Sequence, residues 1–301
     1  MSDINKKRQS QGPPVWIILF GLVVLALLIR YLLQGTNVAL LNPKGFVSSE
    51  QRKLMVFTVG VLLAIAIPSM FLLYFIAWKY RESNPKAKHA PNARPPMLVV
   101  AVIWLAPITV LFVLSTMMWS ATHRLVPQKV IASDTKPITI QVISLRWKWL
   151  FIYPEQQVAS LNFVQLPLNT PVTFEMTADE TPMSSFWIPN LGGQLYTMTS
   201  HVNRLNLMAT TPGDYPGSSA EINGSGFAGM KFTARAGSTS DFNNWVQAVK
   251  DSPDVLDATA YQKLLVPSEY NPSVFYSTFE SSIYANVIRK YEGPGGHTHS
   301  L

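Results

Sequence analysis

The sequence has 301 residues, of which 48% are hydrophobic and 14% are charged. This length accommodates a membrane portion together with one soluble domain, and the low charged share is typical of a protein partly buried in lipid. The absence of cysteine excludes disulfides, thiolate metal sites and cysteine nucleophiles.

The net charge of +7 is unevenly distributed. Residues 1–123 carry 12 Lys and Arg against 3 Asp and Glu, whereas residues 124–301 carry 12 against 14. The basic excess therefore belongs to the hydrophobic half of the chain, where it flanks apolar segments. Because nucleic-acid binding requires a basic face on a folded domain, this distribution argues against a nucleic-acid partner.

The first apolar run extends from Val15 to Leu33, is interrupted only by Arg30 and follows a basic start. Such a segment is either a cleaved signal peptide or a retained signal anchor. It ends in Leu33-Gln34-Gly35-Thr36, which resembles a lipoprotein processing box with Thr36 in place of the cysteine that carries the lipid. Without that thiol no lipid can be attached, so we expect residues 1–36 to be kept as an anchor. Cleavage by an ordinary signal peptidase is the alternative, and it would give a mature N-terminus near residue 37.

Two further apolar runs, Leu54–Trp78 and Met97–Trp119, are long enough to cross a bilayer. Each contains a proline, Pro68 or Pro107, at which a membrane helix bends when its neighbours satisfy the freed backbone groups. The loop of residues 79–96 has five basic residues and one acidic residue. Since cytoplasmic loops are rich in Lys and Arg, we expect this loop and the N-terminus in the cytoplasm, and the domain after residue 123 on the outer side.

Beyond residue 123 the pattern changes to short strands separated by Gly and Pro turns. Val172–Thr177 alternates apolar and polar residues, as a half-buried strand does, and Pro137–Ser144 is rich in Ile and Val. Short strands between turns predict an antiparallel sandwich or barrel. Two helices are expected near Asp241–Lys250 and Asp257–Leu264, with Ser240 as the N-cap of the first.

The segment Ser219–Met230 has the spacing of a copper-binding loop but lacks most of the ligands. In a two-copper site positions 219, 223, 227 and 230 would be Cys, Cys, His and Met, whereas this sequence has Ser219, Asn223, Phe227 and Met230. Thiolate sulfur and imidazole nitrogen hold copper in such sites, and a hydroxyl, a carboxamide and a phenyl ring cannot replace them. We therefore interpret residues 219–230 as a structural turn between two strands.

Further motifs accompany this loop. Ser184–Pro189 reads S-S-F-W-I-P where copper-binding relatives have H-S-F-W-x-P, so Ser184 replaces a histidine ligand. Arg146–Gln156 reads R-W-K-W-L-F-I-Y-P-E-Q and looks like the aromatic strand of the same proteins, and residues 267–290 look like their aromatic C-terminal extension. From about residue 37 to about residue 290 the chain resembles subunit II of the haem-copper terminal oxidases. Within that group it resembles the quinol-oxidizing branch (cytochrome bo-type ubiquinol oxidase), whose copper site is absent.

The resemblance implies a fold class: a membrane α-helical hairpin, plus the N-terminal signal anchor, followed by an all-β cupredoxin-like sandwich with a short helical C-terminal extension. The expected divisions are the anchor or signal peptide (1–36), the two-helix transmembrane hairpin (37–123), the sandwich lacking copper (124–237), the helical and aromatic extension (238–292) and a disordered tail (293–301).

The resemblance also implies a function. The chain is expected to be a non-catalytic subunit of a complex that oxidizes ubiquinol, reduces dioxygen to water and translocates protons. It would lie in the bacterial inner membrane, multi-pass, with its C-terminal domain in the periplasm. Haem and copper are expected in the catalytic subunit I, with subunits III and IV and membrane lipid as further partners. This chain itself would carry no catalytic residue, cofactor or metal, and its copper-site positions are degenerate: Ser184, Ser219, Glu221, Asn223, Phe227 and Met230.

Two other functions stay open. One is a cytochrome c oxidase subunit II with an electron-transfer role, which two coppers bound to the domain after residue 123 would reveal. The other is a stand-alone membrane-anchored cupredoxin-like binding or assembly protein, which would purify without a haem-bearing partner. In the quinol-oxidase family an acidic residue associated with proton-channel entry corresponds to Val100, and valine cannot exchange protons.

Several residues with chemical potential receive structural interpretations. Trp147 and Trp149 are two apart, so on a strand they would share one face. Packing is favoured for them over electron transfer, because no copper acceptor follows. The acidic residues Glu175, Asp179 and Glu180 are interpreted as a solvated turn.

Overall fold

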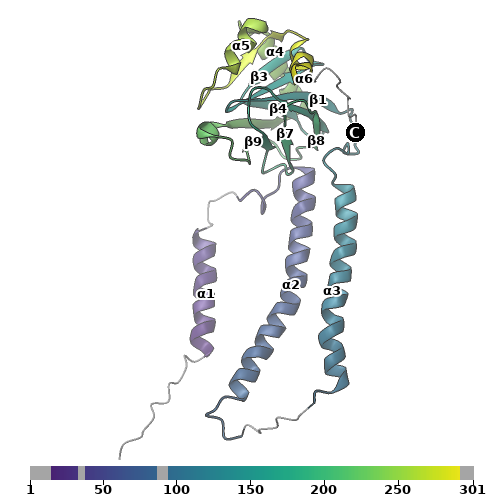
Figure 1. The fold of residues 1–301 in the computed structure, drawn as a ribbon, viewed down its shortest axis with the longest axis vertical. Helices are drawn as coiled ribbons and strands as arrows, with labels where there is room; N and C mark the ends of the chain where they lie inside the picture. The colour runs from purple at the N-terminus through teal and green to yellow at the C-terminus, as the bar shows by residue number, and fades with distance from the viewer. Residues whose placement is uncertain (1–14, 33–37, 87–93, 292–301) are drawn as a thin grey trace, which may run out of the picture.

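The structure is a computed structural model that describes residues 15–32, 38–86 and 94–291, in which a β-rich domain stands on long helices (Figure 1). The sequence predictions for the processing motif at residues 33–36 and for the tail at 293–301 lie outside these residues. The helices are α1 (Val15–Leu32), α2 (Phe46–Lys79) and α3 (Met97–Arg124). Of the helices in the described ranges, α2 and α3 are long and apolar enough to cross a membrane.

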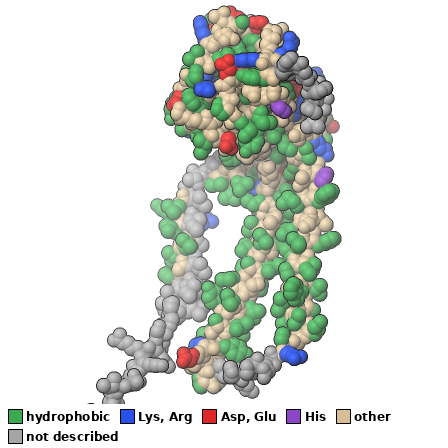
Figure 2. Space-filling view, viewed as in Figure 1, with side chains coloured by type: hydrophobic (Ala, Val, Ile, Leu, Met, Phe, Trp, Pro, Cys, Tyr) green, Lys and Arg blue, Asp and Glu red, His purple; other side chains and the backbone are tan. Residues whose placement is uncertain are grey.

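Helices α2 and α3 expose their apolar side chains. None of the most apolar stretch of either helix is buried, and Figure 2 shows hydrophobic side chains along both. Pro68 lies inside α2 and Pro107 inside α3, and α2 changes direction part-way along its length in Figure 1. A proline inside a helix removes one backbone hydrogen bond and permits such a bend. Apolar faces of this extent require lipid or partner helices around them.

Helix α2 begins at Phe46, eight residues before the apolar run that predicted it. The additional turns are tied to the β-domain and do not depend on lipid. Ser48 accepts a hydrogen bond from the Gly45 N–H, as in a capping box, and its hydroxyl donates to the Asn190 carbonyl at 2.7 Å. The start of this helix is therefore fixed by tertiary hydrogen bonds.

The β-domain is a sandwich of a six-stranded and a five-stranded sheet. The first has the order β12 (Val274–Tyr276), β3 (Val158–Leu161), β2 (Lys148–Tyr153), β1 (Ile138–Leu145), β5 (Val172–Ala178), β8 (Asn203–Leu207). The second has the order β4 (Phe163–Pro167), β10 (Lys231–Gly237), β9 (Gly213–Ser219), β6 (Ser184–Trp187), β7 (Gln194–Thr197). Strand β1 pairs parallel with β5 and β10 pairs parallel with β4, while the other pairings within these two sheets are antiparallel. The predicted order of elements, two long apolar helices followed by a β-sandwich and a short helical C-terminal extension, is confirmed.

An aromatic core fills the space between the two sheets. Phe186 stacks on Phe232 with ring centroids 5.1 Å apart, and Trp149 meets both rings edge-on. All three side chains are buried. Offset and edge-to-face contacts of this kind add to the stabilisation from burial alone.

The C-terminal extension covers the outer face of the six-stranded sheet, adds a strand to the edge of that sheet and packs one helix against the main core. It comprises α4 (Thr239–Lys250), β11 (Val255–Leu256), α5 (Ala258–Leu265), β12, β13 (Thr278–Phe279) and α6 (Ile283–Tyr291), with β11 and β13 paired in parallel. Ile143 and Leu150 point outward from the sheet and are fully buried in a second core with Tyr261, Ile283 and other residues of the extension. Strands β1 and β2 are consequently covered on both faces, and every residue of β2 is buried.

Helix α4 begins at Thr239, two residues earlier than predicted. Its N-cap is Ser238, whose hydroxyl accepts from the Asp241 N–H while the Asp241 carboxylate accepts from the Ser238 N–H. The prediction of Ser240 as N-cap was wrong, because the reciprocal capping pair needs residues three apart and Asp241 provides the second member. Helix α5 is capped by Asp257, which accepts from the Ala260 N–H.

Candidate functional site

The loop that resembles a copper site connects two adjacent antiparallel strands. Residues 220–230 leave β9 after Ser219 and return to β10 at Lys231, and they include the short 3-10 helix η1 (Ser225–Gly229). Strand β6 lies beside β9, with Phe186 opposite Ser219. The sandwich therefore brings Ser184, at the start of β6, to the end of the loop although it is 35 residues earlier in the chain than Ser219.

Three of the degenerate positions form one hydrogen-bonded cluster. The side-chain amide of Asn223 donates to the Ser184 hydroxyl at 2.7 Å and to the Met230 sulfur at 3.1 Å. All three residues are buried. The Asn223 carbonyl oxygen Oδ1 has no hydrogen-bond partner among the described residues. The amide thus occupies the donor role between a hydroxyl and a thioether, at the point where relatives would place a metal.

The other degenerate positions shape the backbone. The Ser219 hydroxyl donates to the Glu221 carbonyl at 2.9 Å and accepts from the Ser185 N–H at 3.3 Å, which joins the loop to β6. Phe227 closes the turn through its carbonyl, which accepts from the Met230 N–H at 3.1 Å. Glu221 takes part through its backbone. The structure therefore unites Ser184, Asn223 and Met230 by their side chains and the remaining three by the loop's hydrogen bonds.

Trp147 packs on this loop and does not share a strand face with Trp149. It has φ of +60° and lies in the turn between β1 and β2, whereas Trp149 points into the aromatic core. The prediction of a shared face was wrong, because Leu145 pairs with Lys148 and leaves Arg146 and Trp147 as a two-residue turn. A Cβ added to Gly226 would lie 2.2 Å from the Trp147 ring, so the glycine makes room for the indole.

The C-terminal extension covers the same loop from the other side. Ser225 donates to the Glu269 carboxylate at 3.2 Å, and Gly229 lies so close to the Tyr270 backbone that an added Cβ would come within 2.9 Å of its nitrogen. Asn162 lies where the chain passes from β3 to β4, and it links the sandwich to the extension by donating to the Asn271 carbonyl at 3.0 Å. The loop is held between an indole and this segment.

A buried carboxylate attaches the extension to the sandwich. The Asp179 side chain is 2% exposed and accepts hydrogen bonds from Tyr261 (2.7 Å), Lys290 (2.9 Å) and Tyr291 (2.7 Å). The interpretation of Asp179 as part of a solvated turn was wrong, because its partners come from 82 to 112 residues further along the chain. Its neighbours differ: Glu175 pairs with Arg204 across β5 and β8, and Glu180 is half exposed and binds Lys290.

The electrostatics of this cluster follow from burial and charge. Burial of Lys290 disfavours its charge, but hydrogen bonds to Glu180 and Asp179 more than offset that effect and raise the pKa of its ammonium group. Burial and the Asp179 hydrogen bond raise the pKa of Tyr261, so the phenol stays protonated and donates. The sequence analysis did not identify Tyr261, Lys290 and Tyr291 as partners of Asp179. The Tyr and Lys residues near the end of the chain were the sequence feature that could have suggested them.

The chemistry of the loop does not fit a copper pair. The donors that the structure gathers are a hydroxyl, a carboxamide and one thioether, and a thioether is a weak ligand when no thiolate or imidazole accompanies it. Within the described ranges there is no group of three or more His, Asp and Glu side chains arranged to hold a metal ion. The polar cluster is satisfied mainly by its own members.

Comparisons with known proteins show which family this chain resembles. Residues 250–295 match the family model of the COX Aromatic Rich Motif. The chain is 43% identical to the cytochrome bo(3) ubiquinol oxidase subunit 2 of Pseudomonas putida over 91% of this chain and 87% of that protein. It is 38% identical to the ubiquinol oxidase subunit 2 of Acetobacter aceti over 86% of this chain and 85% of that protein. A crystal structure of the periplasmic domain of subunit II of cytochrome oxidase from Bradyrhizobium japonicum is 20% identical, covering 45% of this chain and 99% of that one, with a TM-score of 0.36.

Proposed function

Because the chain belongs to the subunit 2 family of the haem-copper ubiquinol oxidases, we propose that it is the structural, redox-inactive subunit of such a complex. Ubiquinol oxidation, dioxygen reduction and proton translocation take place in partner chains, with haem and copper in the catalytic subunit I. Subunits III and IV complete the assembly. The chain lies in the inner membrane with residues 79–96 in the cytoplasm and the sandwich in the periplasm.

The observation that carries this proposal is the side-chain cluster of Ser184, Asn223 and Met230. An amide donates to both neighbours where a metal would need thiolate or imidazole donors. An electron carrier at this position would need a redox-active group, and these side chains have none. We therefore assign to residues 184, 219, 221, 223, 227 and 230 a role in shaping the loop and no role as ligands or catalysts.

The second part of the proposal, a lid fixed over the membrane portion, is supported by the junction between helices and sandwich. The Phe46 N–H donates to the Met208 carbonyl at 3.0 Å and the Thr210 N–H donates to the Lys44 carbonyl at 2.9 Å, both at the start of α2. After α3, the Asn206 backbone and side-chain N–H groups both donate to the Pro127 carbonyl at 2.9 Å. Each membrane helix is thus joined to the sandwich by hydrogen bonds, which holds the domain in one orientation above the bilayer.

The hairpin supplies the surface for docking on subunit I. Its exposed side chains are apolar, so packing and a few polar contacts must specify the partner. Val100 lies in the first turn of α3, at the cytoplasmic end in the proposed orientation. This chain consequently offers no carboxylate at the position associated with proton entry, and the partner must provide that group.

Purification of the intact complex through a C-terminal affinity tag in mild detergent tests the proposal. We expect a haem-bearing subunit to co-purify and the preparation to oxidize ubiquinol but not reduced cytochrome c. Copper analysis of this chain after its separation from the complex should find none above background. Two coppers in the separated chain would establish the electron-transfer alternative, and a tagged chain recovered without haem would establish a stand-alone protein.

A further inference from the structure

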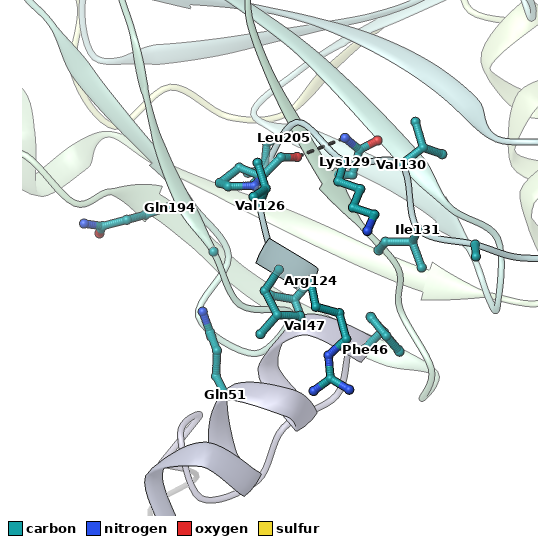
Figure 3. Close-up of a pocket in the computed structure, with 15 residues that line it drawn as sticks. Phe46, Val47, Gln51, Arg124, Val126, Lys129, Val130, Ile131, Gln194 and Leu205 are labelled. Carbon is teal, nitrogen blue, oxygen red and sulfur yellow. Dashed lines mark hydrogen bonds between the residues drawn. The ribbon is translucent and has the colours of Figure 1, made fainter. Parts of the chain in front are cut away.

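We propose that the junction between the two membrane helices and the sandwich is a binding site for a membrane phospholipid, whose phosphodiester lies between Arg124 and Lys129. A cavity of about 510 Å³ lies at this junction. It is bounded by the first turn of α2, the end of α3, the segment that follows α3, and β8 (Figure 3). Its volume is within the range of small-molecule sites, roughly 300–1,000 Å³.

The lining combines a largely apolar wall with two cations. Phe46, Val47, Ile131 and Leu205 contribute apolar surface. In Figure 3 the Lys129 side chain leaves the segment that follows α3 and points to the side of the cavity where α3 ends and Arg124 lies. An apolar wall with two cationic groups suits an amphiphile that carries a phosphate, and it does not suit a neutral quinol headgroup.

The charges leave capacity for an anion. Arg124 forms an ion pair with Glu50 through its Nη2 atom. The Lys129 ammonium group has no hydrogen bond or ion pair among the described residues. Lys53 pairs with the same Glu50 carboxylate, so Arg124, Lys53 and Lys129 set three cations against one carboxylate. This excess positive charge is complementary to the negative charge of a phosphodiester. The ion pair with Glu50 anchors the Arg124 side chain at the start of α2.

The position of the cavity selects the lipid. Both spanning helices end at it, so in a bilayer it lies at the depth of the headgroups, and the exposed apolar faces of α2 and α3 continue away from it. The acyl chains of a bound lipid would follow those faces. Trp119 lies five residues before the end of α3 and packs against His123 with ring centroids 4.4 Å apart, at the same interface.

A photoreactive lipid tests this site in the intact complex. The complex is reconstituted in nanodiscs of phosphatidylethanolamine doped with increasing fractions of a phosphatidylglycerol analogue that has a diazirine in its headgroup. Labelled peptides are mapped by mass spectrometry. We expect saturable labelling of the peptides that contain residues 46–51 and 124–132. Lys129→Gln should raise the half-saturating lipid fraction roughly fivefold, and Lys129→Glu roughly thirtyfold, since one surface cation contributes about a factor of five.

Lys136→Gln is the matched control. Lys136 lies on the same segment, pairs with Glu155 and does not line the cavity, so its replacement should leave labelling unchanged. The haem content of each variant verifies that the complex assembles. Because Lys129 is exposed and its ammonium group is unpaired among the described residues, we expect Lys129→Gln to fold like the parent. The proposal is overturned if labelling of these peptides is absent, if both Lys129 variants label like the parent, or if millimolar inorganic phosphate displaces the lipid. It is equally overturned if residues 124–132 cross-link only to another subunit that fills the cavity.

Discussion

Replacing Asp179 with Asn should loosen the C-terminal extension from the sandwich. The carboxylate is buried and accepts three hydrogen bonds from the extension, from Tyr261, Lys290 and Tyr291. A hydrogen bond to a charged group contributes about 1.5–3 kcal/mol. Asparagine keeps one acceptor oxygen but presents an N–H to donors on the other side. Lys290 is partly exposed and keeps Glu180 as a partner, so no buried charge is left unpaired. We therefore expect the free energy of opening of the extension to fall by about 1.5–3 kcal/mol.

Hydrogen–deuterium exchange measured by mass spectrometry detects this change directly. In the purified complex, peptides from residues 258–291 should exchange roughly ten- to a hundredfold faster in Asp179→Asn, while the peptides of β9 and β10 stay protected. Glu180→Gln is the control, because Glu180 is adjacent and binds the same Lys290 but is half exposed, and surface pairs contribute about 0–1 kcal/mol. Equal exchange in the two variants would refute the argument that burial makes the Asp179 contacts decisive.

Two further predictions concern the loop and its surroundings. Gly226→Ala should destabilise the domain by about 1–3 kcal/mol, because the new Cβ would lie 2.2 Å from the Trp147 ring. Thermal unfolding should show this loss of stability, and the loss should be smaller when Gly226→Ala is combined with Trp147→Leu. The control substitution Ala228→Ser, at an exposed position of the same loop, should cause no such loss. Lys148 is buried and donates to the Val266 carbonyl at 2.7 Å, and burial lowers the pKa of its ammonium group. The pKa of Lys148 is lower in the folded state than in the unfolded state, so at pH values between these two pKa values the unfolded state binds more protons. The contribution of Lys148 to the free energy of unfolding therefore increases as pH rises through that window. The melting temperature of the parent relative to that of Lys148→Met should therefore increase from neutral to alkaline pH. A decrease in this difference would contradict the sign of the burial effect.

The spanning helices could be predicted because lipid imposes a simple requirement, an apolar run of sufficient length. The beginning of α2 could not, since Phe46–Lys53 is not an apolar run and its helical state depends on backbone partners at Asn190, Leu191 and Met208. The strand Val172–Ala178 was readable because one of its faces is more buried than the other. Strand β2 carries no such alternation, because the extension covers its outer face.

The position of Trp147 shows the limit of reading a strand from its sequence. A period of two predicts shared faces only within an uninterrupted strand, and the turn after Leu145 ends one strand and starts another. Asp179 shows a different limit. Whether a carboxylate is solvated depends on which distant segments cover it, and no local pattern around residue 179 contains that information.

The loop at residues 219–230 is held in shape by contacts with other parts of the protein. A bound metal would fix such a loop by drawing its ligands to one centre. Here Asn223 draws Ser184 and Met230 together, Trp147 fills the space that Gly226 leaves, and the segment at Tyr270 closes over Gly229. The spacing of the motif thus indicates the path of the backbone, whereas its side chains determine whether a metal can bind. A loop can therefore keep the spacing of a copper site without the chemistry of one. On this reasoning the aromatic extension supports the loop through the contacts of Glu269 with Ser225 and of Tyr270 with Gly229.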